Sequence, residues 1–151
     1  MEQKDFIDGC IKVETSVASI YSKLMRLFPD KKEFWGSLLN DEREHIAFLN
    51  GVKSLELITE VEKLDFPPSM NIIKKTIKLA DKVNEKLCGN LNTMKDALKM
   101  VRKLEESVVE IYSNQLIARL LSCEDETAIA KLVGDDDKSH IKKIRKMMKQ
   151  V

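Results

Sequence analysis

Polar side chains of the kinds that bind metals occupy positions in four stretches of the chain where a core hydrophobe is expected. They are Glu14, Glu42, His45, Glu105, Asp137 and His140. Burial of one unpaired carboxylate is costly, and burial of several together is worse because like charges raise each other's pKa. A pair of divalent or trivalent metal ions at the centre would remove that cost. The pattern therefore predicts a site for two metal ions.

The spacing of these residues suits such a site. Residues three apart on a helix lie on one face, so Glu42 and His45 present an oxygen and a nitrogen to the same point. Asp137 and His140 repeat the arrangement, and the chain has no other histidine. One Glu-x-x-His motif from each of two helices, with one glutamate from each of the other two, is the ligand pattern of di-iron helical bundles. The remaining ligands would be Glu14 and Glu105.

An internal repeat supports a two-fold site. Residues 13–21 match residues 104–112 at five of nine positions, and each segment contains one of the two single glutamates. Residues 41–46 similarly match residues 136–141, and each of these segments contains one carboxylate-histidine pair. Two halves of the chain are therefore expected to supply equivalent halves of one site.

Apolar residues at three-and-four spacing predict the helices that hold these ligands. The first helix is expected to end at Pro29, and the second to fade before Asp65. A shorter helix is expected from Met70 to about Lys86, with Ser69 as its N-cap.

The second half of the chain predicts two more long helices. Thr93-x-x-Asp96 resembles a capping box, and the third long helix is expected to continue from Leu98 to Gln115. The fourth is expected from Ala130 to Met147.

The expected fold is all-α, with residues 1–151 forming one domain. It consists of an antiparallel helical hairpin at 5–58, a long crossover at 59–92 that contains the short extra helix, and a second hairpin at 93–150. The long crossover lets the second and third long helices run parallel, which makes this a ferritin-like four-helix bundle.

The ligand pattern resembles the rubrerythrin branch of the ferritin-like superfamily. That branch places a tyrosine seven or eight residues after the first-helix and third-helix glutamates, and Tyr21 and Tyr112 stand at these positions. The resemblance implies that each tyrosine hydroxyl hydrogen-bonds a metal-bound carboxylate. Two departures stand out. Asp137 replaces the usual glutamate, and Val108 stands where rubrerythrins proper have a further carboxylate.

The resemblance also implies an activity. Two iron ions would cycle between Fe2+ and Fe3+ in an oxidoreductase, either a rubrerythrin-like peroxidase or a ferroxidase-type enzyme, that reduces hydrogen peroxide or dioxygen during oxidative stress. The chain has no C-x-x-C motif, so electrons would come from a separate donor such as a rubredoxin-type protein. A homodimer is expected. Manganese or zinc could occupy the same ligands. The alternatives are a non-catalytic iron-binding or storage protein and a metal-free helical interaction module.

Composition limits the remaining possibilities. The net charge of +1 creates no overall field that would attract nucleic acid or an anionic membrane, and no stretch approaches the ~20 apolar residues of a membrane span. The cationic stretch near the C-terminus is attributed to the helix dipole. A charged start and three scattered cysteines predict a cytoplasmic protein with reduced thiols. The cysteines are Cys10, Cys88 and Cys123.

Overall fold

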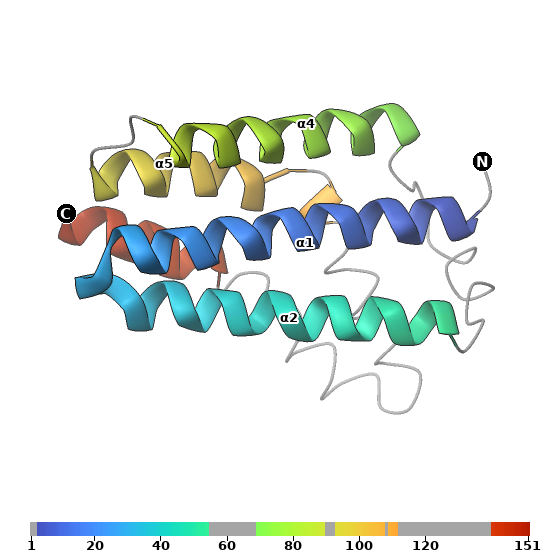
Figure 1. Ribbon diagram of the computed structural model, residues 1–151, viewed down its shortest axis with the longest axis horizontal. Helices are drawn as coiled ribbons and strands as arrows, with labels where there is room; N and C mark the ends of the chain where they lie inside the picture. The colour runs from blue at the N-terminus through green and yellow to red at the C-terminus, as the bar shows by residue number, and fades with distance from the viewer. Residues whose placement is uncertain (1–2, 55–68, 90–92, 108, 112–139) are drawn as a thin grey trace.

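The computed structural model describes residues 3–54, 69–89, 93–107, 109–111 and 140–151. All regular secondary structure in these segments is helical, which confirms the predicted all-α class (Figure 1). No helix of the described segments is both long enough and apolar enough to cross a membrane.

The first two long helices form an antiparallel pair. Helix α1 spans Gln3–Leu27, a single 3-10 turn η1 spans Pro29–Lys31, and helix α2 spans Lys32–Ser54. Proline lacks a backbone N–H and favours the first position of a helical turn, so the chain changes direction where the sequence predicts. Lys53 on α2 binds Asp8 on α1 at 2.6 Å and links the far ends of the pair.

The short extra helix is also present. Helix α4 spans Met70–Leu87, and the Ser69 hydroxyl accepts a hydrogen bond from the Ile72 N–H at 3.3 Å, as predicted for its N-cap. α4 packs along α1 (Figure 1). A Cβ at Gly9 would lie 2.8 Å from Cγ2 of Ile73, so glycine is what allows the two helices to approach this closely.

The third long helix differs from the prediction. Helix α5 spans Met94–Glu105, capped by a Thr93 hydroxyl that accepts from the Asp96 N–H at 3.2 Å. The expectation of an unbroken helix to Gln115 is wrong, because the chain turns at 106–107 and becomes helical again at 109–111. The Ser107 hydroxyl accepts from the Glu110 N–H at 3.3 Å, so Ser107 acts as the N-cap of the new helical turn.

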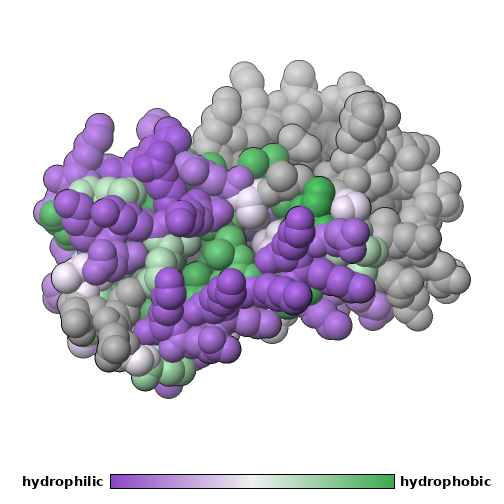
Figure 2. All heavy atoms as spheres, turned by 90° about the horizontal axis from the view of Figure 1, so that it is seen from above, coloured by the Kyte–Doolittle hydropathy of each residue, from purple (hydrophilic) through white to green (hydrophobic). Residues whose placement is uncertain are grey.

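The last described helical segment covers residues 140–150. α2 and α5 run in the same direction, and α1 and the 140–150 segment run in the opposite one (Figure 1). Seen from the side of α4, hydrophilic side chains cover most of the described surface around a narrow apolar area (Figure 2).

The buried core lies between these helices. Its largest fully buried side chains are Trp35, Tyr21, Phe6, Ile7, Ile20, Leu24, Leu38, Leu49, Ile73, Leu98 and Leu104. The last part of the predicted second helix, most of the crossover outside α4, and the first part of the predicted fourth helix lie outside the described residues.

Candidate metal centre

The first hairpin contributes three of the predicted ligands. Glu14 on α1 and Glu42 on α2 are completely buried, and the His45 side chain is 12% exposed. Glu42 and His45 lie three residues apart on α2 and so share one face of the helix. This face is directed at α1, where Glu14 is located.

The second half of the chain contributes two more. Glu105 is the last residue of α5, and His140 lies in the helical segment described at 140–150. Both side chains are almost completely buried, with 1% exposed. The fold therefore brings five of the six predicted ligands into one interior region. The sixth, Asp137, lies outside the described residues, as does Tyr112.

The five residues form two overlapping groups. In the first, His45 Nδ1 lies 3.8 Å from Glu14 Oε2 and 3.9 Å from Glu42 Oε2. In the second, His140 Nδ1 lies 3.7 Å from Glu42 Oε1 and 3.4 Å from Glu105 Oε1. Within each group the potential ligand atoms all lie within 4.8 Å of one another. Glu42 belongs to both groups, and it presents a different oxygen to each.

The distances are those that a metal ion can span. Metal bonds to histidine nitrogen and carboxylate oxygen are about 2.0–2.2 Å long, so two ligands of one ion lie at most ~4.4 Å apart. The four nitrogen-oxygen distances are all shorter than this limit. The two imidazole centroids are 5.9 Å apart, so both histidines border the same carboxylates.

The hydrogen-bonding state of the ligands also fits a bound cation. Among the described residues, ten buried side-chain nitrogen or oxygen atoms have no hydrogen-bond partner. Seven belong to the five ligands, two to the neighbouring Glu110 and one to the Trp35 indole. Unsatisfied polar atoms are normally rare inside proteins. The nine atoms other than the indole nitrogen are on Glu14, Glu42, His45, Glu105, Glu110 and His140.

Tyr21 lies at the edge of the cluster. It is completely buried on α1, and its hydroxyl donates a hydrogen bond to Glu105 Oε1 across the bundle. Oε1 is also the oxygen that lies 3.4 Å from His140 Nδ1, while Oε2 of the same carboxylate has no hydrogen-bond partner. Trp35 stacks against Tyr21 with ring centroids 6.0 Å apart and restricts the position of the phenol.

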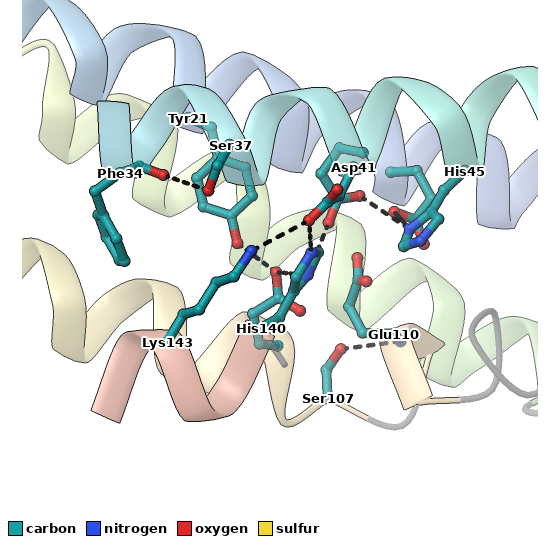
Figure 3. Close-up of polar contacts among 12 residues, drawn as sticks. Tyr21, Phe34, Ser37, Asp41, His45, Ser107, Glu110, His140 and Lys143 are labelled. Atoms are coloured by element: carbon teal, nitrogen blue, oxygen red, sulfur yellow. Dashed lines mark hydrogen bonds and ion pairs between the residues drawn. The ribbon is translucent and has the colours of Figure 1, made fainter. Parts of the chain in front are cut away.

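Sequence reasoning missed Asp41. Its Oδ2 lies 2.8 Å from His140 Nε2, on the ring edge opposite the carboxylate ligands (Figure 3). A hydrogen bond from Nε2–H to Asp41 leaves the lone pair of Nδ1 for a metal, which is how outer carboxylates orient histidine ligands. The signal was in the repeat, because an aspartate precedes the ligand carboxylate at both 41 and 136.

Sequence reasoning also missed Glu110. Its carboxylate is completely buried, and neither oxygen has a hydrogen-bond partner (Figure 3). On an unbroken helix Glu110 would lie ~140° around the axis from Glu105, away from the ligands. The turn at Ser107 changes this register and brings Glu110 inside. The available signal was Ser107-x-x-Glu110, which matches the capping-box pattern.

Crowding of carboxylates changes the proton affinities of the cluster. Burial, together with the charges of Glu14 and Glu110, raises the pKa of Glu42 well above its ordinary value. Burial and the charges of Glu14 and Glu105 raise the pKa of Glu110 in the same way. Burial opposes ionisation of Glu14 too, but Glu42 and His45 hold the pKa of Glu14 below its ordinary value. Glu42 and Glu110 are therefore harder to ionise than ordinary glutamates while the cluster holds no metal.

His140 holds a proton. Burial alone would lower its pKa, but Asp41 and Glu105 outweigh burial and raise the pKa of His140 to about 10. The same pairing with His140 holds the pKa of Asp41 below its ordinary value. Burial and the charge of Glu105 raise the pKa of the Tyr21 phenol well above its ordinary value, so it keeps its proton at neutral pH.

Comparison of the chain with protein-family models, with curated proteins and with solved structures gave no significant match.

Proposed function

We propose that this chain is a ferritin-like, rubrerythrin-type protein that holds two iron ions and reduces hydrogen peroxide or dioxygen with electrons from a separate donor. The observation that carries the proposal is the placement of Glu42, which presents one oxygen to His45 and the other to His140. A carboxylate shared between two nitrogen-containing ligand groups suits a pair of ions rather than one.

The described ligands would bind the two ions in two sets. One ion would be held by Glu14, Glu42 and His45, and the other by Glu42, Glu105 and His140. Each group supplies three protein ligands, and incomplete coordination by protein is what leaves an open position for a substrate. Glu110 lies beside Glu14 with both oxygens unpaired, so it is available as a further carboxylate for the first ion.

Bound iron would relay the donor's electrons to the substrate by changing between its ferrous and ferric states. The protein keeps the ligands in place and limits access of bulk water, since the described ligand carboxylates of Glu14, Glu42 and Glu105 are buried. Tyr21 holds Glu105, and Asp41 holds His140, so two of the three ligands of the second group are supported by a hydrogen bond from outside the group. The buried phenol also provides a proton donor next to Glu105.

Iron is favoured over a purely structural metal by the donor set. Structural zinc sites are closed tetrahedra that are usually rich in cysteine. The ligands of this cluster are carboxylates and imidazoles, and one carboxylate is common to both ligand groups. Manganese and zinc remain possible occupants of the same ligands. The ferritin-like topology, a homodimer and a cytoplasmic location belong to the same proposal.

Metal analysis after anaerobic reconstitution with ferrous iron is the direct test. The proposal requires about two irons per chain, and stopped-flow absorbance should show oxidation of the ferrous protein in a single turnover by peroxide or dioxygen. Faster reaction with peroxide supports the rubrerythrin-type role. Faster reaction with dioxygen, with ferric mineral inside a large assembly, would indicate iron storage instead. A metal content near zero in folded protein would leave a helical interaction module.

A further inference from the structure

The outer face of the 140–150 helix is strongly cationic. Residues 141–149 contain five lysines or arginines and no acidic residue, although the whole chain has a net charge of only +1. A cavity of about 630 Å³ opens on this face, and the described residues that line it are Ile141, Lys142, Arg145, Lys146 and Lys149. We call these five residues the basic face.

The helix dipole accounts for little of this charge. The favourable interaction of cations with a helix C-terminus is confined to about the last turn, which here includes Lys149. Lys142 and Arg145 lie farther from the end of the helix. Ion pairs within the described residues neutralise only part of the face. Arg145 contacts Glu106 at 3.4 Å, whereas Lys142, Lys146 and Lys149 form no ion pair with a described acidic residue.

The basic face and the candidate metal centre lie on different sides of the same helix. His140 lies on the same helical segment, with Nδ1 close to Glu42 and Glu105 in the interior. Lys143, on the side of the helix between these two faces, lies 3.9 Å from the Asp41 carboxylate that binds His140 (Figure 3). A helix with its side chains is about 10–12 Å across, so a molecule on the basic face lies roughly one helix diameter from the ligand nitrogen.

We propose that the basic face is the docking site for a small acidic electron-transfer protein that reduces the metal centre. The proposal rests on the proposed function, which needs an external source of electrons. Charge complementarity selects the partner, because a cationic face accelerates association with an acidic protein. The basic face is favoured over other surfaces because it lies on the helix that carries His140, a ligand of the metal centre. The rate of electron transfer falls steeply with the distance between donor and acceptor. In each encounter the donor loses one electron and the metal pair gains one, so two encounters reduce two ferric ions.

The experiment uses a purified acidic rubredoxin as the probe and two charge-reversed variants of the chain. The test variant combines Lys142→Glu, Lys146→Glu and Lys149→Glu. The matched control combines Lys74→Glu, Lys78→Glu and Lys82→Glu, which changes the charge equally on the exposed face of α4, the side seen in Figure 2. Both variants are checked for helicity by circular dichroism and for metal content.

Two readouts are measured at low and high salt. The first is the second-order rate at which reduced rubredoxin reduces the ferric protein, with dithionite as a small reductant for comparison. The second is binding of fluorescently labelled rubredoxin to the metal-free chain by anisotropy. We expect the test variant to lose about tenfold or more in both rate and affinity at low salt, with the difference shrinking as salt is added. The control variant should stay close to the wild type, and the dithionite rates of all three proteins should agree.

The outcomes separate the two proposals. Equal losses in both variants, or no loss in either, would overturn the docking site even if iron binds and reacts with peroxide. Absence of iron binding would overturn the proposed function, and the anisotropy of the metal-free chain would still decide whether rubredoxin uses the basic face. Binding of a DNA duplex or anionic vesicles with no binding of rubredoxin would also overturn the docking site.

Discussion

The Oδ2 atom of Asp41 lies 2.8 Å from Nε2 of His140, a contact between residues 99 positions apart in the sequence. It joins α2 to the helical segment at 140–150 directly beside the candidate metal centre. Asp41 is itself adjacent to Glu42, so neighbouring residues of α2 contact both ring nitrogens of one histidine. The contact therefore orients a ligand as well as connecting two helices.

Substitution Asp41→Ala should weaken metal binding without abolishing it. Loss of a hydrogen-bond partner behind a histidine ligand typically costs about 10–100-fold in metal affinity. Competition with a chromophoric chelator measures this change for each ion. Asp8→Ala is the control, because Asp8 forms a comparable contact with Lys53 away from the cluster. An affinity unchanged by Asp41→Ala would mean that Asp41 does not orient His140 in the loaded protein.

Substitution Glu42→Gln should remove both ions, whereas Glu14→Gln should mainly remove one. The reason is that Glu42 belongs to both ligand groups and Glu14 to only one. Iron per chain after reconstitution and gel filtration gives the result, with Glu44→Gln as an exposed control on the same helix. Equal loss in both cluster variants would argue against a shared carboxylate.

Metal binding should release protons at neutral pH. The pKa of His140 is raised to about 10, so a metal must displace a proton from its ring, and the raised pKa values of Glu42 and Glu110 act in the same direction. Metal affinity should accordingly rise as the pH rises from about 6 to 8. Titration calorimetry in buffers of different ionisation enthalpy counts the protons. Binding with no proton release would show that the metal-free cluster is already deprotonated.

The metal-free protein should lose stability as the pH rises above about 5. Groups whose folded pKa is raised stabilise the fold at low pH, and that contribution is lost as pH rises from the unfolded value through the folded one. Glu42, Glu110 and His140 all act in this direction, and the loss for His140 extends from about 6.5 to about 10. The lowered pKa values of Glu14 and Asp41 act in the opposite direction only at acidic pH. Thermal melting in the presence of a chelator at pH 5, 7 and 9 tests the slope.

Substitution Glu110→Leu should flatten this pH dependence and stabilise the metal-free protein. Replacement of a buried unpaired carboxylate by an apolar side chain removes both its desolvation cost and its repulsion of Glu14, an effect of about 1–4 kcal/mol in comparable cases. Glu106→Leu serves as the control, because Glu106 is exposed next to the same turn. If Glu110→Leu lowers the melting temperature as much as a core cavity would, Glu110 is held by partners other than those described.

The sequence by itself determined which side chains face the interior. Helical periodicity placed Glu14, Glu42, His45 and Glu105 on apolar stripes, and all four prove to be buried or nearly so. Local signals also located the turn at Pro29 and the hydroxyl cap at Ser69, because these depend on backbone hydrogen bonds within a few residues.

Only the tertiary structure decided which of these side chains meet. The sharing of Glu42 between two histidines, and the bonds from Tyr21 to Glu105 and from His140 to Asp41, depend on how the helices are rotated and aligned against one another. Periodicity within one helix carries no information about that alignment. The burial of Glu110 could not be predicted from periodicity either, because periodicity assumes an unbroken helix. The cap at Ser107 restarts the helical register, and the inward face after that point depends on how the new turn packs in the bundle.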